Sequence, residues 1–166
     1  GIFKLTMDIR NTGSQTSKDY IIGYKVFDPK TNKVIAESEK NSAFNANSTI
    51  SLFGHTEIEI PDVKTWTSEH PNLYKLLMYI KDGEKIVEMV PFNIGFRRIE
   101  IKPIEQKAAN GQPYVCLFIN GQPLKLKGVN IHEHNPATGH YVPEDLMRRD
   151  FELMKQHNLN SVRLCH

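Results

Sequence analysis

Strict alternation of apolar and polar residues is the feature that most limits how this chain can fold. In the first such run every second residue is apolar, and these residues are Phe3, Leu5, Met7 and Ile9. A period of two places one face of a strand in a core and the other face in solvent. The pattern returns over residues 22–26, 56–60, 74–80 and 86–90, with turn residues between the runs. Short strands at this spacing predict a mainly β domain, a β-sandwich over residues 1–97.

Two dipeptides predict hairpins. Asp82-Gly83 separates two of the alternating runs, and Asn120-Gly121 follows an apolar segment at 114–119. The second signal is the stronger one, because both residues of such a turn need a positive φ, which Asn and Gly tolerate. Since both faces of the segment 114–119 are apolar, we expect that strand to be covered on both sides.

The period changes in the last part of the chain. Three apolar residues recur on one helical face, and these are Met147, Phe151 and Met154. We expect a helix over 143–157 that begins with Pro143 and is capped by a left-handed Asn158, then a short strand over 161–165. With the strand that ends near Asn130, these elements make a β-α-β unit with parallel strands and a right-handed crossover. One such unit cannot bury both faces of its strands, so we expect either that the chain is an excised fragment or that the remaining strands come from elsewhere.

Composition excludes several classes of protein. Hydrophobic residues make up 39% and charged residues 24%, which excludes wholesale disorder. No run of about 18 apolar residues is present, so no membrane-spanning helix is expected. Lys plus Arg number 21 against 19 for Asp plus Glu, and this balance gives no reason to expect nucleic-acid binding.

The two cysteines, Cys116 and Cys165, do not make a disulfide framework and do not indicate the cellular compartment. The start at Gly1 is no leader peptide, and either processing or excision would explain it.

The best functional candidates from spacing are His132 and His166, which each follow a predicted parallel strand. The carboxyl ends of parallel strands hold the active site in such folds. The alternative is that each is only a surface histidine. His132 and His134 could also share one face of an extended segment and bind zinc. We expect no metal there, because further ligands at a recognised spacing are missing.

Arg163 lies inside an otherwise apolar short strand. Buried arginines are almost always paired. Arg163 therefore either points into a site against a carboxylate or forms a structural ion pair with Asp150 or Glu152.

The segment Asn120–Asn130 reads NGQPLKLKGVN, and His132-Glu133-His134 follows it closely. The first segment is similar to the "NGxPvxLrGvN" of glycoside hydrolase family 2, which residues 119–166 resemble. The His-Glu-His segment looks like the β-galactosidase branch of that family. The other residues that match are Pro136, Gly139, Asp150, Met154, Lys155, Gln156, Asn158, Asn160, Val162, Arg163 and His166. Upstream, residues 66–74 and 95–97 look like the immunoglobulin-like sandwich that precedes the barrel in this family.

Three residues depart from the branch. Ile131 stands where Arg is usual, Asn135 where a second His is usual, and Cys165 where Ser is usual. These departures bear on the fine substrate preference. The β-glucuronidase branch usually carries Asp where His134 stands, so the resemblance favours a galactoside over a glucuronide.

The resemblance implies a retaining hydrolase with a (β/α)₈ barrel, of which residues 98–166 would be the incomplete N-terminal part. Both catalytic glutamates would lie beyond residue 166, so the isolated chain is expected to be inactive. His132 and His166 would contact the galactosyl unit and help stabilise the transition state, and Arg163 would orient the nucleophilic glutamate. Mg²⁺ near the acid/base is common in this branch, with ligands also beyond residue 166, so no metal or cofactor is expected in this chain.

The expected partner of the parent protein is a β-galactoside, with no nucleic acid and no membrane. The parent could be a homo-oligomer, and its compartment, the cytoplasm or periplasm of a bacterium, stays open. One alternative is a β-glucuronidase-type enzyme of the same family. Another is a non-catalytic sandwich that binds carbohydrate or protein, although Trp66 is assigned to the sandwich core rather than to a sugar platform.

Overall fold

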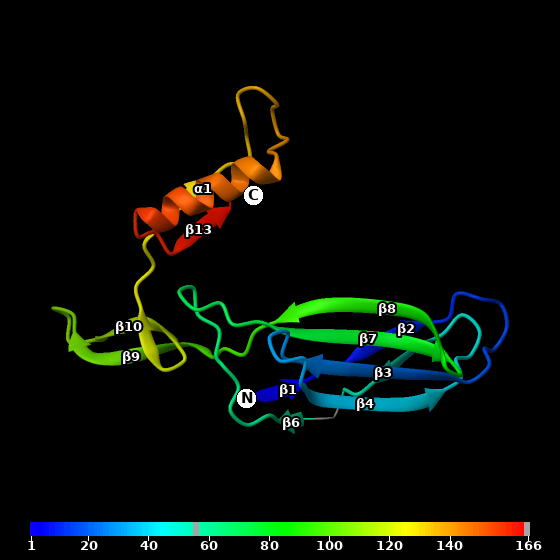
Figure 1. Ribbon diagram of the computed structural model, residues 1–166. Coiled ribbons are helices and arrows are strands. Elements are labelled where there is room, and N and C mark those ends of the chain that lie inside the picture. The colour runs from blue at the N-terminus through cyan, green and yellow to red at the C-terminus, as the bar shows by residue number, and fades with distance from the viewer. Residues whose placement is uncertain (55–56, 165–166) are drawn as a thin grey trace. The chain divides into compact units, whose positions relative to one another are not determined.

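The computed structural model describes residues 1–54 and 57–164, and the chain divides into two units, Gly1–Arg97 and Arg98–His166 (Figure 1). Each unit has its own sheets and is described by itself. Cys165 and His166 lie outside the described residues.

The first unit is built on a four-stranded antiparallel sheet with the strand order β4-β3-β7-β8. Its strands are β3 (Tyr20–Phe27), β4 (Val34–Ser42), β7 (Tyr74–Asp82) and β8 (Lys85–Ile94). The alternation in β3 has the predicted effect, because Ile22, Tyr24 and Val26 share one face and are fully buried. The loop between β7 and β8 is Gly83-Glu84, one residue later than the predicted turn, since Asp82 still pairs with Lys85.

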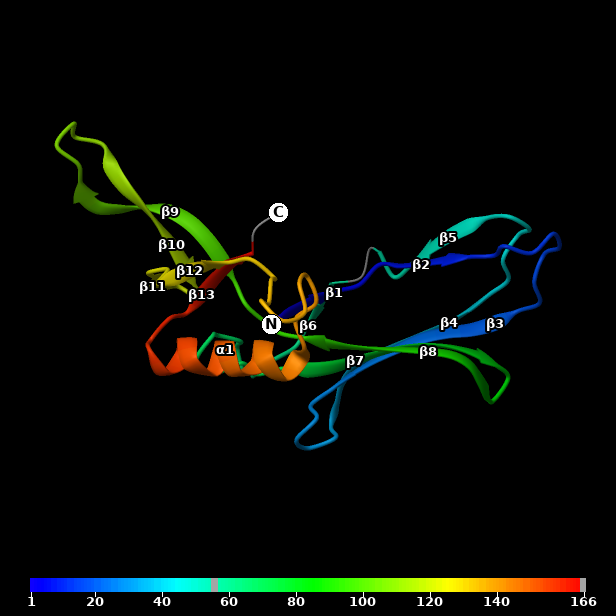
Figure 2. The same cartoon turned by 90° about the horizontal axis from the view of Figure 1, so that it is seen from above.

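A second layer covers the inner face of this sheet. It consists of two antiparallel pairs, β1 (Ile2–Lys4) with β6 (Glu57–Glu59) and β2 (Met7–Arg10) with β5 (Thr49–Leu52). Figure 2 shows β2 and β5 as a layer separate from β3, β4, β7 and β8. The buried side chains between the layers include Phe3, Met7, Tyr24, Phe44, Phe53, Ile60 and Leu76. The predicted sandwich is confirmed.

The alternating run at residues 3–9 is two strands and not one. The chain leaves regular pairing at Leu5-Thr6, and β1 and β2 then pair with different partners. Phe3 and Met7 are nevertheless both buried, because the break does not change which face each residue presents. The sequence pattern reports the face of a residue and not its partner strand.

Trp66 is half-buried and is not a core residue, contrary to its assignment from sequence. Its ring lies under the Arg97 guanidinium at 4.8 Å, and a Cβ on Gly95 would come within 3.1 Å of the ring atom Cγ. Its backbone N–H donates to the Phe96 carbonyl at 2.8 Å. Trp66 therefore packs against the last residues of the first unit.

The second unit begins with a three-stranded antiparallel sheet of order β11-β10-β9. The strands are β9 (Ile99–Lys107), β10 (Pro113–Ile119) and β11 (Gln122–Leu124). The predicted hairpin at Asn120-Gly121 is confirmed, with φ of 49° and 81°. Covering of β10 on both faces is not observed, because Val115 is 62% exposed and the described residues supply no second layer here.

The β-α-β unit follows as predicted. Strands β12 (Gly128–Ile131) and β13 (Ser161–Leu164) are parallel, and α1 (Glu144–Gln156) connects them. Pro143 is the N-cap with extended backbone, one position before its predicted place, and its carbonyl accepts the Met147 N–H. Asn158 has the predicted left-handed backbone, with φ of 59°. The 13-residue helix, the only one among the described residues, is too short and too polar to cross a bilayer.

Candidate functional site

The carboxyl end of β12 carries the first candidate residue. His132 directly follows Ile131, is exposed, and accepts a 2.8 Å hydrogen bond from the His134 N–H through its carbonyl. This tight turn takes the chain out of the strand and into the loop that leads to α1. His132 therefore lies where parallel-strand folds place substrate-binding residues.

Arg163 is the third residue of β13 and stands in register with Asn130 of β12. The residues that follow them, Ile131 and Leu164, line a cavity together with Leu146, Met147 and Phe151 from the α1 side. Successive residues of a strand point to opposite faces. Asn130 and Arg163 are therefore on the strand face opposite the helix, which is the face that points inward when such units close into a barrel.

A close approach of backbone holds the two strands together. A Cβ on Gly128 would meet the Ser161 Oγ at 2.2 Å and the Ser161 carbonyl oxygen at 2.8 Å. Asn160, the residue before β13, accepts the Lys127 N–H at 2.8 Å and donates to the Lys125 carbonyl at 3.0 Å. These contacts set the register that brings Arg163 beside Asn130.

The prediction for His166 falls outside the described residues. In sequence it lies two positions beyond the last described residue of β13, and His132 lies one position beyond β12. The parallel pairing of β12 and β13 is described, while the proximity of the two histidines stays a prediction.

The loop after β12 contains a contact that sequence spacing did not indicate. The rings of His134 and His140 meet with centroids 5.2 Å apart and planes at 75°. From sequence, the functional candidates are His132 and His166, and the pair His132 and His134 is considered only as a zinc site that we do not expect. The signal that could have found the observed pair is the turn sequence Asn135-Pro136-Ala137-Thr138-Gly139 between the two histidines.

The side chains that could bind a metal ion are spread over the described residues. Within residues 1–54 and 57–164, no group of three or more His, Cys, Asp or Glu side chains converges on one point. Mg²⁺ takes mostly oxygen ligands at near-octahedral geometry. The described residues do not make such a site.

Two family models match the chain. "Glycosyl hydrolases family 2" matches residues 1–97, and "Glycosyl hydrolases family 2, TIM barrel domain" matches residues 114–166. The chain belongs to glycosyl hydrolase family 2. The predicted family is confirmed, and so is the predicted order of a sandwich followed by part of a TIM barrel.

Among curated proteins, a beta-galactosidase of Streptococcus thermophilus is 36% identical over 78% of this chain and 11% of its own length. A beta-galactosidase of Pseudoalteromonas haloplanktis is 35% identical over 93% of this chain and 14% of its own length. Among solved structures, a beta-glucuronidase of Bacteroides uniformis superposes with a TM-score of 0.79 at 21% identity, covering 97% of this chain and 18% of that one. The chain thus spans about a tenth to a seventh of the curated relatives, and the structural likeness shows the fold alone.

Proposed function

We propose that this family 2 chain is part of a retaining glycosidase that hydrolyses terminal β-galactosides. The observation that carries the proposal is the similarity to beta-galactosidases at 35–36% identity, which extends in one case over 93% of the chain. His134 supports the same preference, because β-glucuronidases of the family usually carry Asp at that position.

In a retaining mechanism one carboxylate attacks the anomeric carbon while a second protonates the leaving oxygen, and the two lie about 5–5.5 Å apart. We assign both carboxylates to glutamates outside this chain. The isolated 166-residue chain should therefore turn over no galactoside. Measurable hydrolysis of a chromogenic galactoside by rigorously purified chain, lost in His132→Ala, would refute this assignment.

Arg163 is proposed to orient the nucleophilic glutamate. Its place on the strand face opposite α1 directs it toward the barrel interior, where its charge would keep the carboxylate ionised and fixed in direction. His132 and His166 are proposed to donate hydrogen bonds to the galactosyl hydroxyls. Bonds that strengthen as the ring flattens toward the oxocarbenium-like transition state would raise the rate as well as the affinity.

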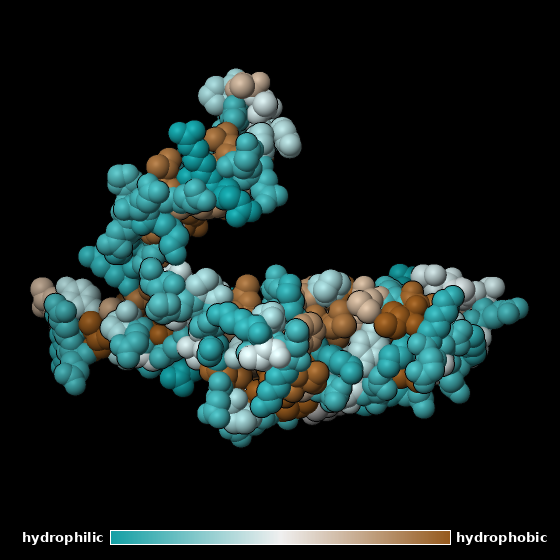
Figure 3. All heavy atoms as spheres, in the orientation of Figure 1, coloured by the Kyte–Doolittle hydropathy of each residue, from teal (hydrophilic) through white to brown (hydrophobic). Residues whose placement is uncertain are grey.

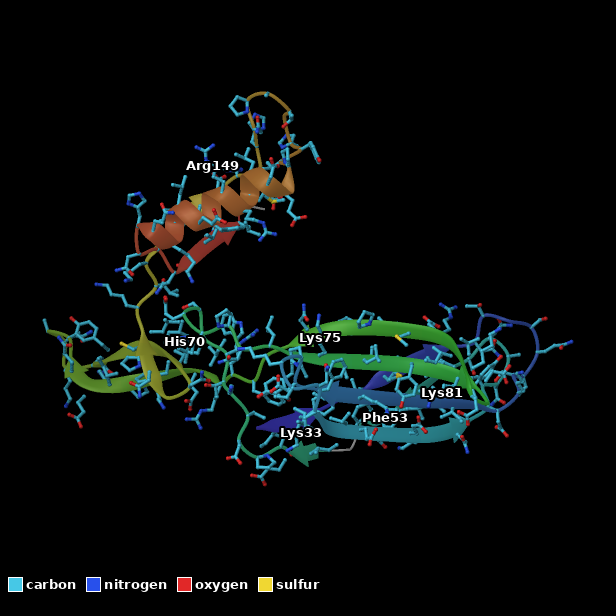
Figure 4. The ribbon with its side chains drawn as sticks, viewed as in Figure 1. Lys33, Phe53, His70, Lys75, Lys81 and Arg149 are labelled. Carbon is cyan, nitrogen blue, oxygen red and sulfur yellow. The ribbon has the colours of Figure 1, made fainter. Side chains whose placement is uncertain are left out.

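The test is kinetic and uses the full-length enzyme. Arg163→Ala should lower kcat about tenfold to a hundredfold with little change in KM, because a charge-assisted hydrogen bond contributes about 1.5–3 kcal/mol. Arg149→Ala is the matched control, since Arg149 is an exposed arginine of α1 (Figure 4). His166→Ala should change both kcat and KM. If the kcat of Arg163→Ala stays within a factor of about two of that of the unmodified enzyme, the assigned role is wrong. Arg163 is then a structural ion-pair residue.

Substrate choice is tested by comparing nitrophenyl β-galactoside with nitrophenyl β-glucuronide. A kcat/KM that favours the galactoside supports the proposal. A preference for the glucuronide would keep the family and the roles of the residues but replace the sugar.

A further inference from the structure

The loop between β12 and α1 is closed by a pair of backbone hydrogen bonds. The Asn135 N–H donates to the Gly139 carbonyl at 2.8 Å, and the Gly139 N–H donates back to the Asn135 carbonyl at 2.8 Å. The Asn135 side chain also accepts the Ala137 N–H at 2.7 Å. Gly139 has a φ of 68°, which suits glycine best. The loop is therefore a defined turn with an antiparallel bridge at its base.

The bridge determines which side chains meet. His134 precedes Asn135 and His140 follows Gly139, so the two histidines form the next facing pair of the antiparallel segment. Their ring centroids are 5.2 Å apart, and both side chains are exposed. Each imidazole can thus rotate about its side-chain bonds while its backbone stays in place.

This separation matches shared coordination of one ion. Zinc-bound imidazole nitrogens lie about 2.0–2.1 Å from the metal, and two imidazoles on one tetrahedral ion have ring centres about 5 Å apart. Imidazole is also the ligand that zinc, nickel and copper ions share. Because no third His, Cys, Asp or Glu converges here among the described residues, water would fill the other coordination positions.

We propose that His134 and His140 together bind a divalent transition-metal ion of the zinc class. This pair differs from the His132 and His134 pair considered from sequence. The turn holds the two imidazoles close together, so an ion bound to one imidazole binds the second in an intramolecular step. Such linkage raises affinity by about a hundredfold or more over a single imidazole.

The experiment is a competition titration of the 166-residue chain with Zn²⁺ against a chromophoric chelator. His134→Gln and His140→Gln should each weaken Zn²⁺ binding about a hundredfold, and the double variant should be no weaker than either single variant. His157→Gln is the matched control, because His157 is an exposed histidine at the end of α1. It should leave the affinity unchanged. Circular dichroism of each variant checks that the fold is retained.

Two results would overturn the proposal. The first is equal Zn²⁺ affinity in the unmodified chain and the double variant. The second is a loss in His132→Gln as large as that in His140→Gln, which would assign the ion to the extended pair instead. Electron paramagnetic resonance of the Cu²⁺-loaded chain gives a readout independent of competition, with coupling to two nitrogens expected for the unmodified chain and to one nitrogen for either single variant.

Discussion

On the outer face of the four-stranded sheet, a glycine is covered by an aromatic ring. Gly23 of β3 pairs with Tyr79 of β7, and a Cβ on Gly23 would lie 2.6 Å from the Tyr79 ring. Tyr79 is only 4% exposed, and its hydroxyl donates to the Glu39 carboxylate at 2.8 Å. Lys81, labelled in Figure 4, donates to the same carboxylate oxygen at 2.6 Å. Glycine is thus required at position 23 because the Tyr79 ring leaves no room for a side chain, and not because of the backbone angles.

Gly23→Ala should lower the free energy of unfolding by about 1–3 kcal/mol, because the new methyl group displaces the Tyr79 ring. The penalty should largely disappear in a Tyr79→Ala background, where the ring is gone. A double-mutant cycle from urea unfolding measures the difference. Additive effects of the two changes would mean that the ring is not what excludes a side chain at position 23.

Burial raises the pKa of Tyr79 above its ordinary range, and the hydrogen bond to Glu39 raises it further. The neutral phenol is then favoured in the folded state, whereas the unfolded chain ionises this group near pH 10. The contribution of the raised Tyr79 pKa to the free energy of unfolding is therefore fully present below about pH 10. It is lost as the pH rises above about 10. Burial raises the pKa of Tyr24 in the same direction.

The free energy of unfolding should fall more steeply between about pH 9 and about pH 11 in the unmodified chain than in Tyr79→Phe. Tyr24→Phe should remove a separate part of the same pH dependence. Equal slopes for the unmodified chain and Tyr79→Phe would contradict the assigned cause.

At the scale of elements, the parallel pair β12–β13 depends on one small residue. Gly128 leaves no room for a Cβ against the Ser161 backbone, so the two strands approach closely at their amino ends. The resulting register is what places Asn130 beside Arg163. The position of Arg163 beside Asn130 therefore depends on a strand contact two residues away.

Gly128→Ala should weaken amide protection in β12 and β13 while leaving β3 and β7 unchanged, because the added methyl group forces the strands apart. Hydrogen exchange read by mass spectrometry resolves the two units. Val129→Ala is the control, because residue 129 already has a Cβ and the change to Ala adds no atom between the two strands. Similar loss of protection from both changes would show that the strand pair tolerates the Gly128 methyl group.

For the whole molecule, the two units differ in what they bury. All twelve buried hydrophobic residues are in the first unit, and no described residue of the second unit is buried. Even in the first unit, β8 keeps apolar side chains in solvent, as the brown surface over this strand in Figure 3 shows. The exposed apolar residues of β8 are Ile86, Val87, Met89, Val90 and Phe92.

Limited proteolysis should therefore cut the second unit first, beyond residue 128, and leave the sandwich of residues 1–97 intact. A unit without buried side chains opens locally at low free-energy cost. Mass analysis of early fragments locates the cuts. Equal protection of both units would indicate that the second unit is covered, by the first unit or by another copy of the chain.

The sequence by itself determined which residues of β1, β2 and β3 face the sandwich core, where the Asn120-Gly121 hairpin lies, and where the period changes from two to 3.6. Those properties depend on neighbours along the chain, as the alternation in β3, the Asn120-Gly121 hairpin and the Asn158 cap illustrate. Strand spacing indicated His132 and His166, the apolar strand indicated Arg163, and the family motifs added the roles expected of these three residues. Only the tertiary structure decided that residues 3–9 split between two partner strands, that Tyr79 requires Gly23, that Arg163 faces away from α1, and that His134 meets His140. Each of these features depends on strand register or on loop closure. The periodicity of side chains along the sequence carries no information about either.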